Sequence, residues 1–219
     1  MTAPPALPLT WLDRVMLSLV LGLGFLVASF PARNSDLWQH LATGRLLAAG
    51  EFSFGPDPFA YTTEGVVWVD HAWLFDLSLY LTYSTLGGAA VVLCKALGVG
   101  LLAVVLLRFR REDASPSLVA LCVLLALIAM SPRLLVQPVV ASLLMLALCL
   151  NRLHRGGRAA WAVPPLIALW VNLDAWFVLG PLLVVVFWLS RPPADRRIPA
   201  LVVPASLLAC LIRDRKSVV

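Results

Sequence analysis

The chain has 219 residues, of which 61% are hydrophobic and only 13% are charged. A soluble globular domain is about 45–50% apolar and about 25% charged, so this composition excludes an ordinary soluble fold and predicts an integral membrane protein. The net charge of +5 does not indicate a nucleic-acid partner, because the basic residues stand in short clusters between apolar runs, as in membrane proteins.

The first apolar run predicts a membrane span over residues 11–30, which Pro31 ends. A spanning helix needs about 20 apolar residues, and proline does not continue a helix without losing a hydrogen bond. A retained span is favoured over a cleaved signal peptide, because Asp13 stands beside Arg14 where a signal peptide is positively charged. Either interpretation puts the next segment outside.

Residues 31–88 form the predicted first outer loop, with two interfacial helices. Apolar residues at helical spacing predict a short amphipathic helix over 37–49, which Gly50 closes. A turn-rich aromatic stretch follows and suits a membrane–water boundary. Residues 72–86 predict a second helix, which is short for a span and carries Asp76, so an interfacial position is expected.

Six further apolar runs complete an all-α polytopic bundle of about seven spans. Several are short and need flanking residues to cross the bilayer. The runs are 89–107, 118–130, 139–150, 161–173, 177–189 and 198–212.

Three arginine clusters set the predicted orientation, because basic residues in short loops favour the cytoplasm. The clusters are Arg108, Arg110 and Arg111; Arg152, Arg155 and Arg158; and Arg191, Arg196 and Arg197. Two apolar runs separate each cluster from the next, so all three can lie inside. Four polar–aromatic clusters then share the outer face, and these are Asp36–His40, Trp68–Trp73, Pro132–Arg133 with Gln137–Pro138, and Asn172–Trp176.

The first two clusters supply the candidate catalytic residues Asp36, His40, Asp70 and His71. Asp36 and His40 are four residues apart and share a helix face. Two acids and two imidazoles together can position a hydroxyl or hold a hard divalent cation. The alternative is structural, with the acids capping helices and the tryptophans anchoring at the interface.

Five more polar residues are candidates for binding phosphate or sugar: Lys95, Arg133, Gln137, Asn172 and Asp174. A planar guanidinium such as that of Arg133 suits phosphate. Lys95 lies about 13 Å into a predicted span, where an ammonium should have an acidic or phosphate partner. Snorkelling of Arg133 and Lys95 and a polar interfacial turn at Asn172 and Asp174 are the alternatives.

Taken in order, these motifs resemble the GT-C superfamily, polytopic glycosyltransferases that take a sugar from a polyprenyl-phosphate carrier on the outer face of the membrane. The chain is most similar to a bacterial branch described as glycosyltransferase-like or dolichyl-phosphate-mannose-mannosyltransferase-like. That branch shows Asp-x-Trp-Trp-His, Thr-Asp-Pro-Phe-x-Tyr-Thr, Trp-x-Asn-His-Glu-Trp-Leu, Arg-Pro-Gln and Trp-Ala-Asn-Leu-His-Gly-Gly. The matching segments are Asp36–His40, Pro56–Thr62, Trp68–Leu74, Pro132–Leu134 with Gln137, and Trp170–Trp176.

The resemblance implies an inverting hexosyl- or pentosyltransferase of the bacterial inner membrane, with the lipid bilayer and a polyprenyl-phosphate-linked sugar as partners. Asp36 matches the family's first-loop acid, which acts as base or as ligand of a divalent metal (Mg or Mn). Arg133 and Lys95 match groups that bind the carrier phosphate. Three departures imply an altered site or lost activity. Gln39 replaces a Trp, Asp70 precedes the His in place of an acid after it, and Asp174 stands where the family shows His.

The end of the sequence raises a separate expectation. Residues 214–219 match what a common sequencing adapter encodes before a stop codon, so residues 1–213 are expected to be the membrane module of a longer protein. The alternative is an ordinary basic tail. Two other functional interpretations remain open: a transporter or flippase-like binder of a lipid-linked substrate, and a degenerate polytopic protein without a ligand.

Overall fold

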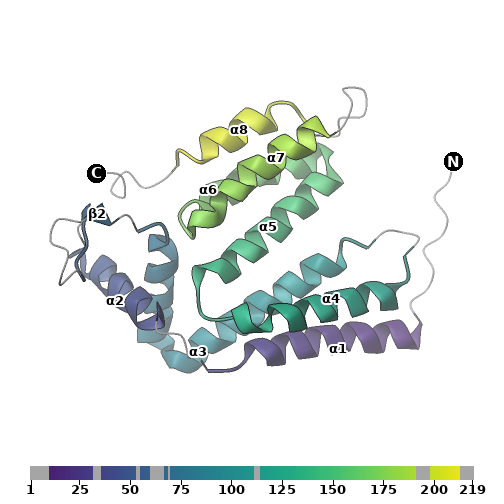
Figure 1. The fold of residues 1–219 in the computed structure, drawn as a ribbon, viewed down its shortest axis with the longest axis horizontal. Coiled ribbons are helices and arrows are strands. Elements are labelled where there is room, and N and C mark those ends of the chain that lie inside the picture. The colour runs from purple at the N-terminus through teal and green to yellow at the C-terminus, as the bar shows by residue number, and fades with distance from the viewer. Residues whose placement is uncertain are drawn as a thin grey trace.

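The computed structural model describes residues 10–31, 36–52, 55–59, 67–68, 70–110, 114–190 and 198–212. Residues 214–219, and Arg111, Arg191, Arg196 and Arg197 of the basic clusters, lie outside these ranges. The described chain is mainly helical (Figure 1). Its α-helices are α1 Trp11–Ala28, α2 Asp36–Ala49, α3 Trp73–Leu107, α4 Pro116–Met130, α5 Pro138–Arg155, α6 Val163–Trp170, α7 Leu179–Leu189 and α8 Val202–Ala209.

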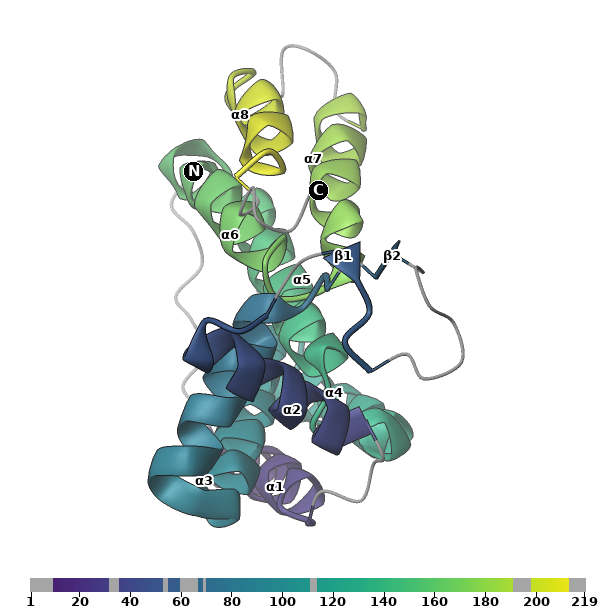
Figure 2. The same cartoon turned by 90° about the vertical axis from the view of Figure 1, so that its left-hand side faces the viewer.

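Short elements connect these helices. Three 3-10 turns, η1 Ser131–Arg133, η2 Gly157–Ala162 and η3 Ala175–Val178, lie before α5, α6 and α7. Two two-residue strands, β1 Gly55–Pro56 and β2 Val67–Trp68, form an antiparallel pair in the first loop. This pair lies beside α2, which faces the viewer in Figure 2.

Local sequence explains where several helices start. At α1, the Thr10 side chain accepts a hydrogen bond from the Asp13 backbone N–H, and the Asp13 carboxylate accepts one from the Thr10 N–H, which is a capping box. Pro116 and Pro138 occupy first-turn positions of α4 and α5, where a missing N–H costs nothing.

A kink at Gly87 divides α3 into the two helices that the sequence predicts over 72–86 and 89–107. Gly87 has φ 80° and ψ 176°, a conformation that glycine adopts readily because it has no side chain. The break therefore lies where the Gly87-Gly88 pair indicated it.

The helices pack in two groups that meet along α3 and α5 (Figure 1). In one group, α1 and α4 lie side by side against the second part of α3, around Val20, Val99 and Leu127. In the other, α5 to α8 enclose a core that includes Ile167 and Val184. The helix α2 rests on the first part of α3 through a small separate cluster of apolar side chains.

Three helices among the described residues are long and apolar enough to cross a membrane: Trp11–Ala28, Trp73–Leu107 and Pro116–Arg133. Residues Ala175–Leu189 form a shorter apolar helix. Many large side chains on these helices face outward, including Leu26, Leu97, Leu125 and Leu182. Soluble monomers rarely expose contiguous apolar patches of this kind. The all-helical class and the membrane character agree with the sequence analysis, and the count of about seven spans remains a prediction.

Candidate functional site

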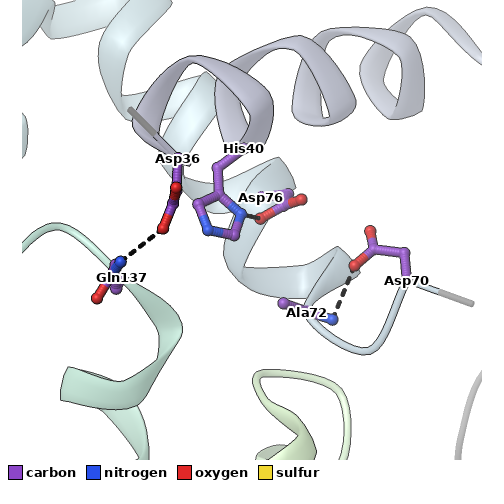
Figure 3. Close-up of polar contacts among 6 residues, drawn as sticks. All are labelled: Asp36, His40, Asp70, Ala72, Asp76 and Gln137. Carbon is purple, nitrogen blue, oxygen red and sulfur yellow. Dashed lines mark hydrogen bonds and ion pairs between the residues drawn. The ribbon is translucent and has the colours of Figure 1, made fainter. Parts of the chain in front are cut away.

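Asp36 and Gln137, 101 residues apart in the chain, meet at one end of the helical bundle (Figure 3). Asp36 opens α2, and Gln137 is the extended residue that precedes α5. The Gln137 side-chain amide donates a hydrogen bond of 2.7 Å from Nε2 to Asp36 Oδ2. Both residues were predicted to belong to the site, and the structure brings them together.

One turn further along α2, His40 contacts an acid that sequence reasoning did not include. His40 Nδ1 lies 2.6 Å from Asp76 Oδ1 of α3. The His40 side chain is 19% exposed and the Asp76 side chain only 2%. The ring of Phe75 meets the imidazole edge-on, with centroids 5.4 Å apart. The only available sequence signal was a carboxylate inside an otherwise apolar helix, which is unusual unless it has a partner.

Gly44 allows this contact by letting α2 approach α3 closely. A β-carbon at position 44 would lie 2.2 Å from the Asp76 carbonyl oxygen and 2.6 Å from Tyr80 Cβ. Any larger residue therefore has to separate the two helices. His40 lies one turn before Gly44 on the same helix face, so the close approach also sets the His40–Asp76 distance.

Asp70 and the His40–Asp76 pair are electrostatically coupled. Asp70 is buried in the turn before α3, and its Oδ1 accepts a hydrogen bond of 2.9 Å from the Ala72 N–H. Burial acts to lower the pKa of His40. The hydrogen bond and charge of Asp76, with the charges of Asp70 and Asp36, outweigh burial and raise that pKa above its ordinary value of 6.5. His71 is exposed beside Asp70, and its catalytic role remains a prediction.

Arg133 lies at the same end of the molecule as Asp36. It is an exposed residue of η1, four positions before Gln137. Four residues of extended chain span at most about 14 Å, so Arg133 cannot be far from the Asp36–Gln137 contact.

Lys95 is buried where α3 passes the end of α1. Its side chain is 7% exposed, and Nζ donates a hydrogen bond of 3.1 Å to the Phe30 carbonyl oxygen. The same ammonium lies 3.7 Å from the centroid of the Phe30 ring. The sequence predicted an acidic or phosphate partner. Within the described residues, a carbonyl and an aromatic ring take that place.

A cavity of about 250 Å³ between α3 and α5 connects Lys95 with Gln137. Most of its lining is apolar, and both of these polar side chains contribute to it. An apolar cavity with a few polar groups at defined positions is the usual form of a small-molecule site. Through Gln137, this cavity adjoins the Asp36 carboxylate.

The side chains of Asn172 and Asp174 hold the turn after α6 against α3 and α5. Asn172 Oδ1 accepts from the Trp73 indole N–H at 3.0 Å, and its backbone carbonyl accepts from the Leu74 N–H. Asp174 accepts a hydrogen bond from the Ser142 hydroxyl. These contacts join the turn after α6 to α3 and α5. A role for either residue in substrate binding remains a prediction.

Another interhelical contact marks the opposite end of the bundle. The Ser117 hydroxyl donates a hydrogen bond of 2.6 Å to Asp13 Oδ1, which joins the starts of α1 and α4. The 18 residues of α1 span about 27 Å between this contact and Phe30 beside Lys95. The acid–imidazole cluster and the Asp13–Ser117 contact therefore lie at opposite ends.

The expected divalent metal has no ligand set in the part of the chain that the structure describes. A hard cation takes about six oxygen ligands, and no group of three His, Cys, Asp or Glu side chains gathers there. Metal binding by Asp36 stays a prediction.

Comparisons of this chain with protein-family models, with curated proteins and with solved structures found no match.

Proposed function

We propose that this chain is the membrane module of an inverting glycosyltransferase that moves a sugar from a polyprenyl-phosphate carrier to an acceptor hydroxyl outside the cytoplasm. The observation that supports this best is the meeting of Asp36, His40 and Gln137 at one end of the bundle, beside the cavity that Lys95 lines. The order of the sequence motifs, which resembles that of the GT-C superfamily, supports the choice of a polyprenyl-phosphate sugar as the substrate.

The proposed setting is a bacterial inner membrane crossed about seven times, with the first loop outside. In this arrangement α2 and the first part of α3 lie along the outer surface. The contact between Asp13 and Ser117 then lies near the cytoplasm, as do Arg108 at the end of α3 and Arg155 at the end of α5. This matches the positive-inside rule.

The proposed reaction is a single displacement. The acceptor oxygen forms a bond to the anomeric carbon of the sugar while the bond from that carbon to the phosphate oxygen breaks. The electron pair leaves with the carrier phosphate, and the hydroxyl proton passes to a basic group of the cluster, for which Asp36 is the positional match in the family. Attack opposite the leaving group inverts the anomeric configuration.

Two basic side chains are placed to favour departure of the phosphate in this proposal. The guanidinium of Arg133 can hold phosphate oxygens in a bidentate manner. Within the described residues, the ammonium of Lys95 donates a hydrogen bond to the Phe30 carbonyl, and it borders an apolar cavity suited to the isoprenoid next to the phosphate. Positive charge directed at a developing phosphate anion stabilises the transition state.

Binding of the carrier can be measured with the full chain in lipid nanodiscs. Polyprenyl phosphate should bind, and polyprenol of the same length should bind at least tenfold more weakly, since a hydrogen bond to a charged group contributes about 1.5–3 kcal/mol. Lys95→Met and Arg133→Ala should each weaken binding of the phosphate. The matched control Arg158→Ala, at the end proposed to face the cytoplasm, should not. Equal binding of phosphate and alcohol would contradict the proposal.

Sugar transfer separates an enzyme from the transporter or flippase alternative. Full chain in vesicles is supplied with radiolabelled polyprenyl-phosphate hexose or pentose and a mixture of membrane acceptors, and release of polyprenyl phosphate is followed. We expect release from the unaltered chain and at least 100-fold slower release from Asp36→Asn, within the range expected when the acid–base group is lost or weakened. Carrier movement across the vesicle without release would favour the transporter.

A further inference from the structure

We propose that Asp76 is a positioning residue for His40, and that Nε2 of this pair takes the proton from the acceptor hydroxyl. The inference rests on the proposed transfer for the identity of the proton donor. It assigns the base to this pair in place of Asp36, and Asp76 lies outside the motifs that suggested the site. Asp36 then acts through its charge, which favours the protonated imidazole.

Geometry determines which ring nitrogen is available. Nδ1 of His40 is engaged by Asp76 at 2.6 Å, so Nε2 is the nitrogen left to face a substrate. In Figure 3 the other ring nitrogen points away from Asp76, toward the side on which Asp36 and Gln137 lie. The edge-on contact with Phe75 restricts rotation of the ring. A histidine whose Nδ1 is held by a carboxylate has a fixed tautomer and orientation.

The burial of Asp76 indicates more than a link between helices. Taking a carboxylate out of water is costly, and a pair of buried charged groups is weak evidence for stability. Elsewhere this chain joins helices through an acid and a hydroxyl, in Asp13 with Ser117 and in Asp174 with Ser142. At the Asp36 end the partner is an imidazole, which can accept a proton, and Gly44 holds the two helices close enough for the contact.

The charges around His40 favour proton uptake. Among the described residues, the charged groups that act on the imidazole are Asp76 on α3, Asp70 in the preceding turn and Asp36 on α2. Together they outweigh burial and raise the pKa of His40, and a base is most effective when its pKa lies near the working pH. In the transfer, the O–H proton moves to Nε2 as the C–O bond forms. Asp76 stays a carboxylate and stabilises the imidazolium.

The tautomer of neutral His40 can be measured without any substrate. The chain has only three histidines, His40, His71 and His154, so ring-¹⁵N histidine labelling in nanodiscs gives three sets of signals, assigned with His71→Gln and His154→Gln. We expect neutral His40 to carry its proton on Nδ1, and to titrate at a lower pH in Asp76→Asn. The control Asp13→Asn removes another buried acid, at the opposite end, and should leave His40 unchanged. The inference would be overturned if neutral His40 carried its proton on Nε2, or if Asp76→Asn left the pH at which His40 titrates unchanged.

The rate of transfer against pH provides the second test, with the polyprenyl-phosphate sugar that the unaltered chain uses. His40→Gln should slow release by about 100-fold or more. Asp76→Asn should slow release and move the rising limb of the pH profile to lower pH, a change that a purely structural link would not cause. If the unaltered chain transfers sugar and both variants keep its rate and pH profile, the assignment of the base to His40 and Asp76 is wrong, while the proposed function stands. If the unaltered chain transfers no sugar, the proposed function fails and this inference fails with it.

Discussion

The four buried acids among the described residues have three kinds of partner. Asp13 accepts from a hydroxyl at one end of the bundle, and Asp174 accepts from a hydroxyl in the α5–α6 region. Asp70 accepts from a backbone N–H in a turn, and Asp76 meets an imidazole. Because a buried carboxylate without a partner is costly, these contacts are where single substitutions should have the largest effects.

The His40–Asp76 pair should make stability depend on pH. The pKa of His40 is raised above its unfolded value of 6.5, so the contribution of the charged imidazole is present at about pH 6.5 and is lost as pH rises through the folded value. Burial raises the pKa of Asp76 to about 6, so the ion pair also weakens as pH falls below that value. We expect His40→Gln to lower the melting temperature in detergent more at about pH 6.5 than at about pH 9. An equal loss at both values would show that the charged imidazole contributes nothing to folding.

The buried hydroxyl of Ser142 should contribute measurably to stability. It accepts a hydrogen bond of 2.7 Å from the Trp170 indole N–H and donates one to Asp174. Ser142→Ala leaves both buried groups without this partner, at a cost of about 1–3 kcal/mol each. Titration with SDS in mixed micelles measures this loss in the free energy of unfolding. The control Ser190→Ala, at an exposed hydroxyl that donates to the Phe187 carbonyl, should change the free energy of unfolding little.

At the scale of elements, the close packing of α2 on α3 is the feature that assembles the site. The first turn of α2 supplies Asp36 and its second turn His40, while α3 supplies Asp76. The kink at Gly87 separates the part of α3 that carries Asp76 from the part that packs against α1 and α4. A change in the α2–α3 spacing should therefore affect the site while leaving the α1–α4 group in place.

Gly44→Ala tests this spacing. Its new β-carbon would meet the Asp76 carbonyl oxygen at 2.2 Å, and overpacking of this kind costs about 1–3 kcal/mol. We expect lower stability in SDS titration and loss of the raised His40 titration in ¹⁵N spectra. The matched control is Gly22→Ala on α1, where nothing lies within 4 Å of the new β-carbon. That variant should be neutral or slightly stabilising, since alanine favours helix over glycine. Equal behaviour of the two variants would show that the α2–α3 distance is not critical.

The sequence predicts these elements well where the signal is local. The helix expected over 37–49 is α2, and the break expected at Gly87-Gly88 is the kink of α3. The sequence does not predict that Asp36 pairs with Gln137 or His40 with Asp76, because helical periodicity shows which face is apolar but not which other helix covers it. From the sequence alone, Asp76 indicates only an interfacial position for residues 72–86 rather than a membrane span.

At the scale of the whole molecule, two interhelical contacts define opposite ends. Asp13 with Ser117 joins the starts of α1 and α4, and Asp36 with Gln137 joins the starts of α2 and α5. Arg133 lies near the second contact, and Arg155 ends α5 about 27 Å from its start. The proposed transferase needs the second end to face outward, since the acid, the imidazole and the guanidinium must meet one lipid-linked substrate there.

Surface labelling of single cysteines in intact cells tests this arrangement most directly. In a chain with its four native cysteines replaced, Trp38→Cys and Arg133→Cys should both react with a membrane-impermeant maleimide. Ser115→Cys and Arg158→Cys should react only after the membrane is opened. Labelling of positions 38 and 133 from opposite sides would contradict the shared outer site, and with it the transferase proposal.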